Sequence, residues 1–268
     1  MKSVSGLSSG LFLGLIALAG VLAATPARAE DTPAPPSPPA TETCEVPDSL
    51  LASESALPKV EEAVKSGHPL DILVIGSRSS TINATANSSE ASAYPARLQA
   101  ALKEKLPSIA VNVSVEIQAK KTAEEIAPSL AKLMEGKKPT LVIWQTGTVD
   151  AVRSIDPEDF RAAVDEGVVA LREAGADVIL MNPQYSPRTE TMISVPPYLD
   201  NMRVVAQQHE VPLFDRFAIM RHWAESGEFD LFSTFHGNEL AKRVHNCLGR
   251  ALSQFVMEAA HLNPAQQN

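Results

Sequence analysis

The sequence has few of the residues on which several specialised kinds of protein depend. Only 5% of its 268 residues are aromatic, which leaves little for stacking on bases or lining a long sugar cleft. Its 23 lysines and arginines are outnumbered by 32 acidic residues, which argues against a nucleic-acid-binding protein. Two cysteines exclude a scaffold built from many disulfides and a cysteine-rich zinc module. With 44% hydrophobic residues, the chain is expected to form an ordinary α/β domain with one sizeable core.

Motifs for common cofactors are also missing. The six histidines are scattered without paired spacing, so the sequence predicts no metal site. No glycine-rich phosphate-binding motif follows the first predicted strand, which argues against a nucleotide cofactor. We therefore expect a protein that works without a metal or a cofactor.

The first residues have the pattern of an export signal. Lys2 precedes an uncharged apolar run over residues 11–24, and Ala27 and Ala29 flank Arg28 in the small-x-small pattern of a signal-peptidase site. The run is shorter than the roughly 20 residues that cross a bilayer, so a cleaved signal over residues 1–29 is preferred to an uncleaved anchor. We expect no membrane span after cleavage and a periplasmic or secreted protein.

A proline-rich segment separates this signal from the predicted domain. Residues 30–43 contain five prolines and no large apolar residue, which is typical of an extended spacer. The domain is expected over residues 44–262, followed by a short tail over 263–268. Cys44 and Cys247 lie near its two ends, and in an oxidising compartment we expect them to form a disulfide.

Strand and helix patterns alternate through this domain. Apolar runs predict strands over residues 70–75, 140–144, 177–181 and 211–214, and an alternating apolar pattern predicts one over residues 111–117. Helical spacing of apolar residues predicts helices over residues 94–106, 122–134, 157–174, 197–209, 216–225 and 238–260. Strands joined by helices of this length predict a parallel sheet of about five strands, covered by helices on both faces.

Polar residues gather where several of these strands end, which is where ligands bind in such a sheet. Residues 76–81 (GSRSST) offer a glycine turn and hydroxyl groups, residues 147–150 (GTVD) a turn and a carboxylate, and His236 precedes the last helix. A serine and a histidine that meet from opposite ends of the chain form the arrangement of nucleophilic acyl transfer. In that chemistry the imidazole takes the proton of the hydroxyl.

Four blocks carry a family resemblance, namely residues 72–81 (ILVIGSRSST), 94–98 (YPARL), 144–148 (WQTGT) and 181–187 (MNPQYSP). In this order they resemble the SGNH (GDSL-type) hydrolases, most closely their exported bacterial branch, over residues 44–258. The resemblance implies a three-layer flavodoxin-like fold and hydrolysis of carboxylic esters of lipids or carbohydrates. It also implies a serine nucleophile in the first block, and an Asp and a His just before the last helix.

Carried over by position, the resemblance makes Ser79 the candidate nucleophile. Ser77 and Ser80 remain alternatives, because Arg78 looks like an insertion in the first block. His236 becomes the candidate base. The family's acid stands three residues before the histidine, but here the nearest acid is Asp230, six residues before, so Asp230 is the candidate that orients the imidazole.

The oxyanion hole departs from the family pattern in two places. The second-block glycine is missing near residues 118–121, where Lys120 or Lys121 could supply positive charge or could simply be solvated. The third-block asparagine is replaced by Val149. The candidate pocket residues are Gly76, Ser77, Lys121, Gly147, Thr148, Val149 and Asp150.

Two functions therefore stay open. Removing one oxyanion donor typically lowers turnover about 10²–10³-fold, so the first is a weak or specialised serine esterase of the cell envelope, acting on a small acyl ester. The second is a catalytically impaired relative that keeps the fold and binds an envelope glycan, a lipid or a partner protein.

Overall fold

A single parallel sheet organises the computed structural model, which describes residues 43–82, 91–232 and 237–262. Its strand order is β2-β1-β3-β4-β5. This is the flavodoxin-like order, and it confirms the predicted fold. The strands are β1 (Leu70–Gly76), β2 (Val111–Ile117), β3 (Leu141–Gln145), β4 (Asp177–Met181) and β5 (Leu213–Phe214).

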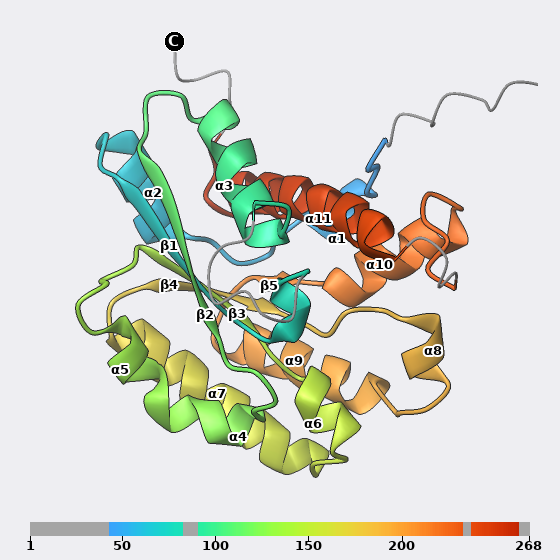
Figure 1. Ribbon diagram of the computed structural model, residues 1–268. Helices are drawn as coiled ribbons and strands as arrows, with labels where there is room; N and C mark the ends of the chain where they lie inside the picture. The colour runs from blue at the N-terminus through green and yellow to red at the C-terminus, as the bar shows by residue number, and fades with distance from the viewer. Residues whose placement is uncertain (1–42, 83–90, 233–236, 263–268) are drawn as a thin grey trace, which may run out of the picture. The chain divides into compact units, whose positions relative to one another are not determined.

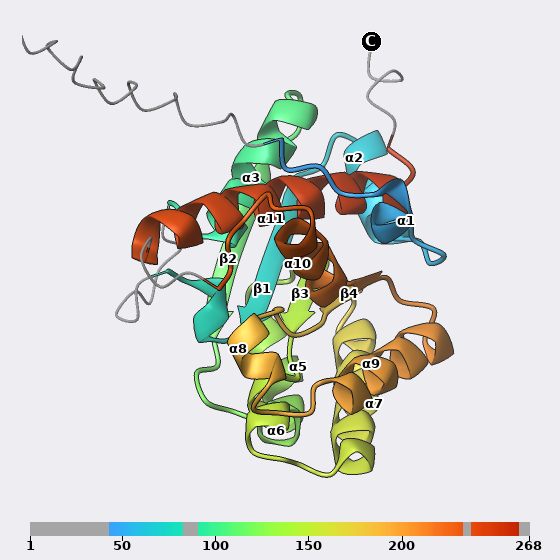
Figure 2. The same ribbon diagram turned by 90° about the vertical axis from the view of Figure 1, so that its right-hand side faces the viewer.

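Helices cover both faces of this sheet (Figures 1 and 2). One layer contains α1 (Asp48–Leu51), α2 (Pro58–Lys65), α3 (Tyr94–Lys105), α10 (Arg216–Glu225) and α11 (Gly237–Ala259). The opposite layer contains α4 (Ala123–Ile126), α5 (Leu130–Met134), α7 (Pro157–Glu173) and α9 (Pro196–Gln208). Two further short helices are α6 (Thr148–Val152) and α8 (Pro187–Glu190).

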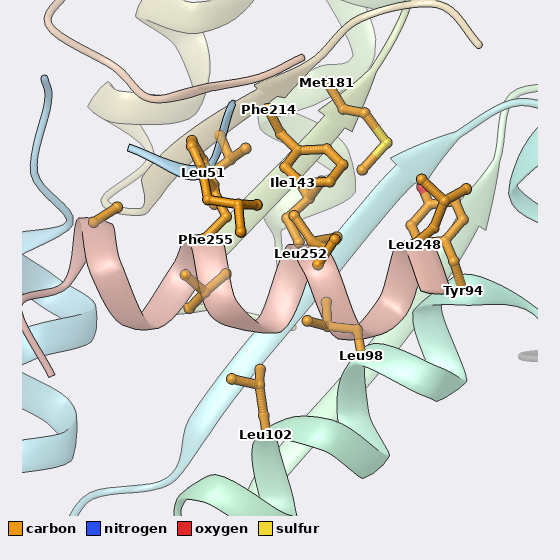
Figure 3. Close-up of a cluster of buried hydrophobic side chains, with 14 of the residues drawn as sticks. Leu51, Tyr94, Leu98, Leu102, Ile143, Met181, Phe214, Leu248, Leu252 and Phe255 are labelled. Atoms are coloured by element: carbon orange, nitrogen blue, oxygen red, sulfur yellow. The ribbon is translucent and has the colours of Figure 1, made fainter. Parts of the chain in front are cut away.

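The central strands are mostly hydrophobic because both of their faces are buried. Ile72 and Val74 of β1 belong to the cluster under α3 and α11, whereas Leu73 and Ile75 belong to the cluster under α7 and α9. In Figure 3, Leu252 of α11 points into the first cluster together with residues of the sheet. Successive side chains of a strand point to opposite faces, so a continuous apolar run is the pattern that a sheet between two helical layers requires.

The predicted helix over residues 122–134 is interrupted. It consists of α4, a 3₁₀ turn over residues 127–129 and α5. Pro128 lies in the turn and has no N–H to donate to the preceding turn of a helix, which explains the break. Thr122 and Glu125 nevertheless form a reciprocal capping box at the start of α4.

The expected disulfide is present between Cys44 and Cys247. It joins the start of the described chain to α11 across a sequence separation of 203 residues. The predicted signal, almost all of the spacer, and the C-terminal tail lie outside the described residues. Among the helices that the structure describes, none combines the length and apolarity needed to cross a bilayer.

Candidate active site

The candidate nucleophile lies in a tight turn just beyond the end of β1. Ser77 Oγ accepts the N–H of Ser79 at 3.4 Å, and the two hydroxyl oxygens are 3.2 Å apart. Gly76 makes the turn possible, because a Cβ at this position would collide with Ser80 Oγ. Arg78 is exposed, so the residue that looks inserted points away from the core.

Gln145, the last residue of β3, holds this serine turn in place. Its Nε2 donates to Ser79 Oγ at 2.7 Å and to Ser77 Oγ at 3.0 Å. Its Oε1 accepts the hydroxyls of Ser80 at 2.8 Å and Tyr94 at 3.0 Å. The amide is buried, its Nε2 donates two hydrogen bonds and its Oε1 accepts two, so this network fixes the orientation of the amide.

A buried arginine approaches Ser79 from the end of β5. Arg216 Nη1 donates to Ser79 Oγ at 3.2 Å, and Nη2 donates to the Ser79 carbonyl at 3.2 Å and to Gln184 Oε1 at 3.0 Å. Its side chain is 1% exposed, its Nε has no partner, and no carboxylate among the described residues forms an ion pair with it. Burial lowers the pKa of Arg216 to about 10, so the group stays charged at neutral pH.

A second buried residue near the turn is His245 of α11. Its Nδ1 accepts the backbone N–H of Tyr94 at 3.0 Å. Burial, and then the charge of Arg216, lowers the pKa of His245 to about 3, so the ring is neutral at pH 7 and carries its proton on Nε2. An imidazole held in this form offers a donor, and it has no free nitrogen with which to deprotonate Ser79.

The structure brings all seven predicted oxyanion-pocket residues to one small cavity. Its volume is about 10 Å³, which leaves room for one water at most. Val149 is half-buried there and supplies no amide donor in place of the missing asparagine. The cavity is lined by Gly76, Ser77, Lys121, Gly147, Thr148, Val149 and Asp150, together with Gln145 and three neighbours.

Asp150 supports the wall of this cavity. Its Oδ1 accepts the N–H of Ala123 at 2.8 Å, which anchors the start of α4. Burial raises the pKa of the Asp150 carboxyl, and its Oδ2 has no partner among the described residues. Lys121, by contrast, is exposed at the rim.

The structure describes the predicted acid, Asp230, but not the predicted base, His236. Asp230 is exposed, and its Oδ1 accepts the N–H of Phe232 at 3.1 Å. His236 lies outside the described residues. Within the described chain, the side chains that contact Ser79 Oγ are those of Ser77, Gln145 and Arg216, and none of them is a general base. The roles of His236 and Asp230 therefore remain predictions.

Gln145, Arg216 and His245 had no predicted role, although Gln145 and Arg216 contact Ser79 and His245 lines a cavity with Arg216. Gln145 ends β3, and Arg216 begins α10 with only Asp215 between it and β5, so the rule that ligands bind at strand ends points to both. The sequence offers no local signal for a role of His245. It is buried, and its ring also lines a cavity beside Arg216.

Comparison with known proteins places this site in a family. The model of the non-GDSL lipase-like family matches residues 43–262. No curated protein matches the chain.

Three solved structures have a similar fold. Axe2, an acetylxylan esterase from Geobacillus stearothermophilus, aligns with a TM-score of 0.57 and 15% identity, over 82% of this chain and 100% of that chain. LAE5, an α/β hydrolase enzyme from the metagenome of Lake Arreo, aligns with a TM-score of 0.55 and 20% identity, over 80% and 99%. A putative lipolytic G-D-S-L family protein from Desulfitobacterium hafniense aligns with a TM-score of 0.53 and 16% identity, over 69% and 99%.

These similarities agree with the resemblance seen in the sequence blocks. At such identities the solved structures establish the fold, and the family model, which spans most of the chain, establishes membership. The chain belongs to the non-GDSL lipase-like family and has the fold of the SGNH hydrolases.

Proposed function

We propose that the protein is an exported serine esterase, weak or specialised, which hydrolyses acyl esters of an envelope lipid or carbohydrate with Ser79 as its nucleophile. The observation that carries this proposal is the pair of side-chain donors on Ser79 Oγ, Gln145 Nε2 at 2.7 Å and Arg216 Nη1 at 3.2 Å. The family positions that normally supply a glycine and an asparagine donor lack them here. Gln145 and Arg216 take over their task.

The chemistry follows from where negative charge develops. When Ser79 Oγ attacks the carbonyl carbon of an ester, the carbonyl oxygen becomes an oxyanion. The oxyanion and Oγ are then bonded to the same carbon. Donors that already contact Oγ therefore lie within reach of this oxyanion. Arg216 adds a full positive charge in a buried site, where electrostatic stabilisation is stronger than in water.

The same geometry accounts for slow turnover. In the resting structure Ser79 Oγ accepts hydrogen bonds from both Gln145 and Arg216, which occupy both of its lone pairs. Attack requires one donor to move from Oγ to the new oxyanion, and this rearrangement adds to the barrier. His236 is proposed to take the hydroxyl proton and to return it to the leaving alcohol, with Asp230 orienting its ring.

One observation favours the alternative, a catalytically impaired protein that binds an envelope glycan, lipid or protein. No described residue at Ser79 Oγ can accept its proton, and the predicted oxyanion cavity has a volume of only about 10 Å³. The two functions differ in one measurable respect, which is covalent turnover at Ser79.

Hydrolysis of p-nitrophenyl acetate and butyrate by the purified protein separates them. We expect slow release of p-nitrophenol by the wild type, no release above buffer by Ser79→Ala, and reduced but measurable release by Ser77→Ala and Ser80→Ala. His236→Ala should match Ser79→Ala. A wild-type rate equal to that of buffer, with circular dichroism confirming a folded protein, would refute the esterase and leave the binding function.

A further inference from the structure

A second, larger cavity is lined by Arg216, which does not line the small candidate oxyanion cavity. Its volume is about 220 Å³, and it is formed by the loop after β4 and by α10 and α11. None of the described residues that line it is acidic. Its principal walls are Gln184, Arg216 and His245 on the polar side and Met220, Leu240 and Val244 on the apolar side.

The polar side offers hydrogen-bond donors and positive charge. Gln184 uses its Oε1 to accept from Arg216, which leaves the two N–H groups of its amide as donors. His245 uses its Nδ1 to accept from Tyr94, so its Nε2 carries a hydrogen. Arg216 has an Nε–H without a partner. Gln184 and His245 therefore keep free donors and no free acceptor, and Arg216 adds a buried charge, while the hydroxyls of Tyr185 and Ser186 also line the cavity.

The charge of Arg216 is the least expected of these features. Burying a guanidinium without an acidic partner costs several kcal/mol. Arg216 has three hydrogen bonds and the ring of Tyr94 beside it, but no carboxylate among the described residues pairs with its charge. An anion in the cavity would offset it. A single guanidinium among neutral donors matches one negative charge, so a carboxylate fits the cavity better than a doubly charged phosphate.

The apolar side defines the rest of the ligand. Met220 of α10 faces Leu240 and Val244 of α11 across the cavity, with Leu231 beside them. Contact with these side chains removes hydrocarbon from water, which contributes about 25 cal/mol for each Å² of apolar surface buried. The ligand that fits this cavity therefore has a charged end and an apolar body, which makes it an amphipathic anion.

We propose that this cavity, which we call the carboxylate cavity, binds an aliphatic carboxylate, with its charged end at Arg216, Gln184 and His245 and its chain along Met220, Leu240 and Val244. The proposal rests on the proposed function only in its location next to Ser79. The carboxylate is that of a free aliphatic acid.

Direct binding tests the cavity without any turnover. We expect octanoate to bind the Ser79→Ala variant, measured by titration calorimetry at pH 7, and octanamide, its neutral analogue of nearly equal shape, to bind at least about 10-fold more weakly, as expected for loss of a charged hydrogen bond. Equal binding of the two ligands, or binding of neither, would overturn the proposal. Because Ser79→Ala cannot turn over an ester, this result is independent of whether the protein is an esterase.

A matched pair of variants locates the site. Leu240 is half-exposed, so Leu240→Asp and Leu240→Asn should both fold, and they differ only in charge. We expect Leu240→Asp to bind octanoate about 10-fold more weakly than Leu240→Asn, because a carboxylate in the wall repels the ligand. Equal affinity of the two variants would place octanoate elsewhere and overturn the assignment. Arg216→Gln, if folded, should lose the preference for octanoate over octanamide.

Discussion

Gln145 donates a hydrogen bond of 2.7 Å to Ser79, and this contact ties the end of β3 to the turn after β1. Because the buried amide satisfies four hydroxyl groups, Gln145→Leu leaves several polar groups unpaired at once. We expect it to lower the free energy of unfolding by about 2–4 kcal/mol, measured by urea denaturation.

The control for that measurement is Gln99→Leu, which removes one hydrogen bond, from the N–H of Val113. It should lower the free energy of unfolding by about 1 kcal/mol. If Gln145→Leu is no more destabilising than Gln99→Leu, the Gln145 network does not hold the serine turn.

His245 gives the folded protein a defined dependence on pH. Its pKa is lowered to about 3 from an ordinary value of 6.5, so between these values the unfolded chain binds more protons than the folded one. The stabilising effect of the neutral ring is complete above pH 6.5 and is lost as pH falls toward 3. His245→Asn keeps an acceptor for Tyr94 N–H and removes the titration.

We therefore expect the wild type to lose about 2 kcal/mol of unfolding free energy relative to His245→Asn between pH 7 and pH 5. His68→Asn, at an exposed histidine, controls for the substitution itself. A difference between wild type and His245→Asn that stays constant with pH would show that His245 is not held neutral by burial.

Asp177, the first residue of β4, acts as a tertiary cap for α2. Its Oδ2 accepts the N–H groups of Lys59 at 2.8 Å and Val60 at 3.0 Å, which are otherwise unpaired at the start of the helix. Asp177→Ala should lower the free energy of unfolding by about 1–2 kcal/mol, and Asp177→Asn, which keeps a carbonyl oxygen, by less. Equal losses in the two variants would mean that the cap contributes little.

The Cys44–Cys247 disulfide closes nearly the whole described domain. With a sequence separation of 203 residues, the chain-entropy model gives a stabilisation of about 5 kcal/mol. Titration of the unreduced, denatured protein should find no free thiol, and the Cys44→Ser/Cys247→Ser variant should unfold at markedly lower urea concentration. Two titratable thiols in the unreduced protein would contradict the bridge.

The fold could be predicted from the sequence because the spacing of apolar residues in each segment agrees with the faces that the fold buries. β1, β3 and β4 are mostly apolar and β2 alternates, and helices with regular apolar spacing stand between these strands. Because β3 and β4 are buried completely, their apolar runs are easy to recognise. The short helices α1, α6 and α8 were not predicted, since about one turn shows no periodicity. The eight-residue helix α2 was passed over although Val60, Ala63 and Val64 have helical spacing. Pro128 was visible in the sequence but was passed over within an otherwise helical pattern.

The site was predicted less well, for a physical reason. Ser79 and the residues of the small candidate oxyanion cavity are close to sequence motifs, whereas Arg216 and His245 reach the candidate site only through the packing of α10 and α11. A lone arginine at a helix start is usually a surface residue, and nothing in the sequence shows that this one is buried without an acidic partner. Its burial is a property of the fold.

The central claim, that Ser79 is a nucleophile, is tested most directly by a fluorophosphonate probe followed by mass spectrometry of the labelled peptide. The probe requires an activated hydroxyl but not the natural substrate. We expect a single adduct on Ser79 in the wild type and none in Ser79→Ala or His236→Ala. No adduct on the folded wild-type protein, or an adduct on Ser77 or Ser80, would contradict the assignment of Ser79.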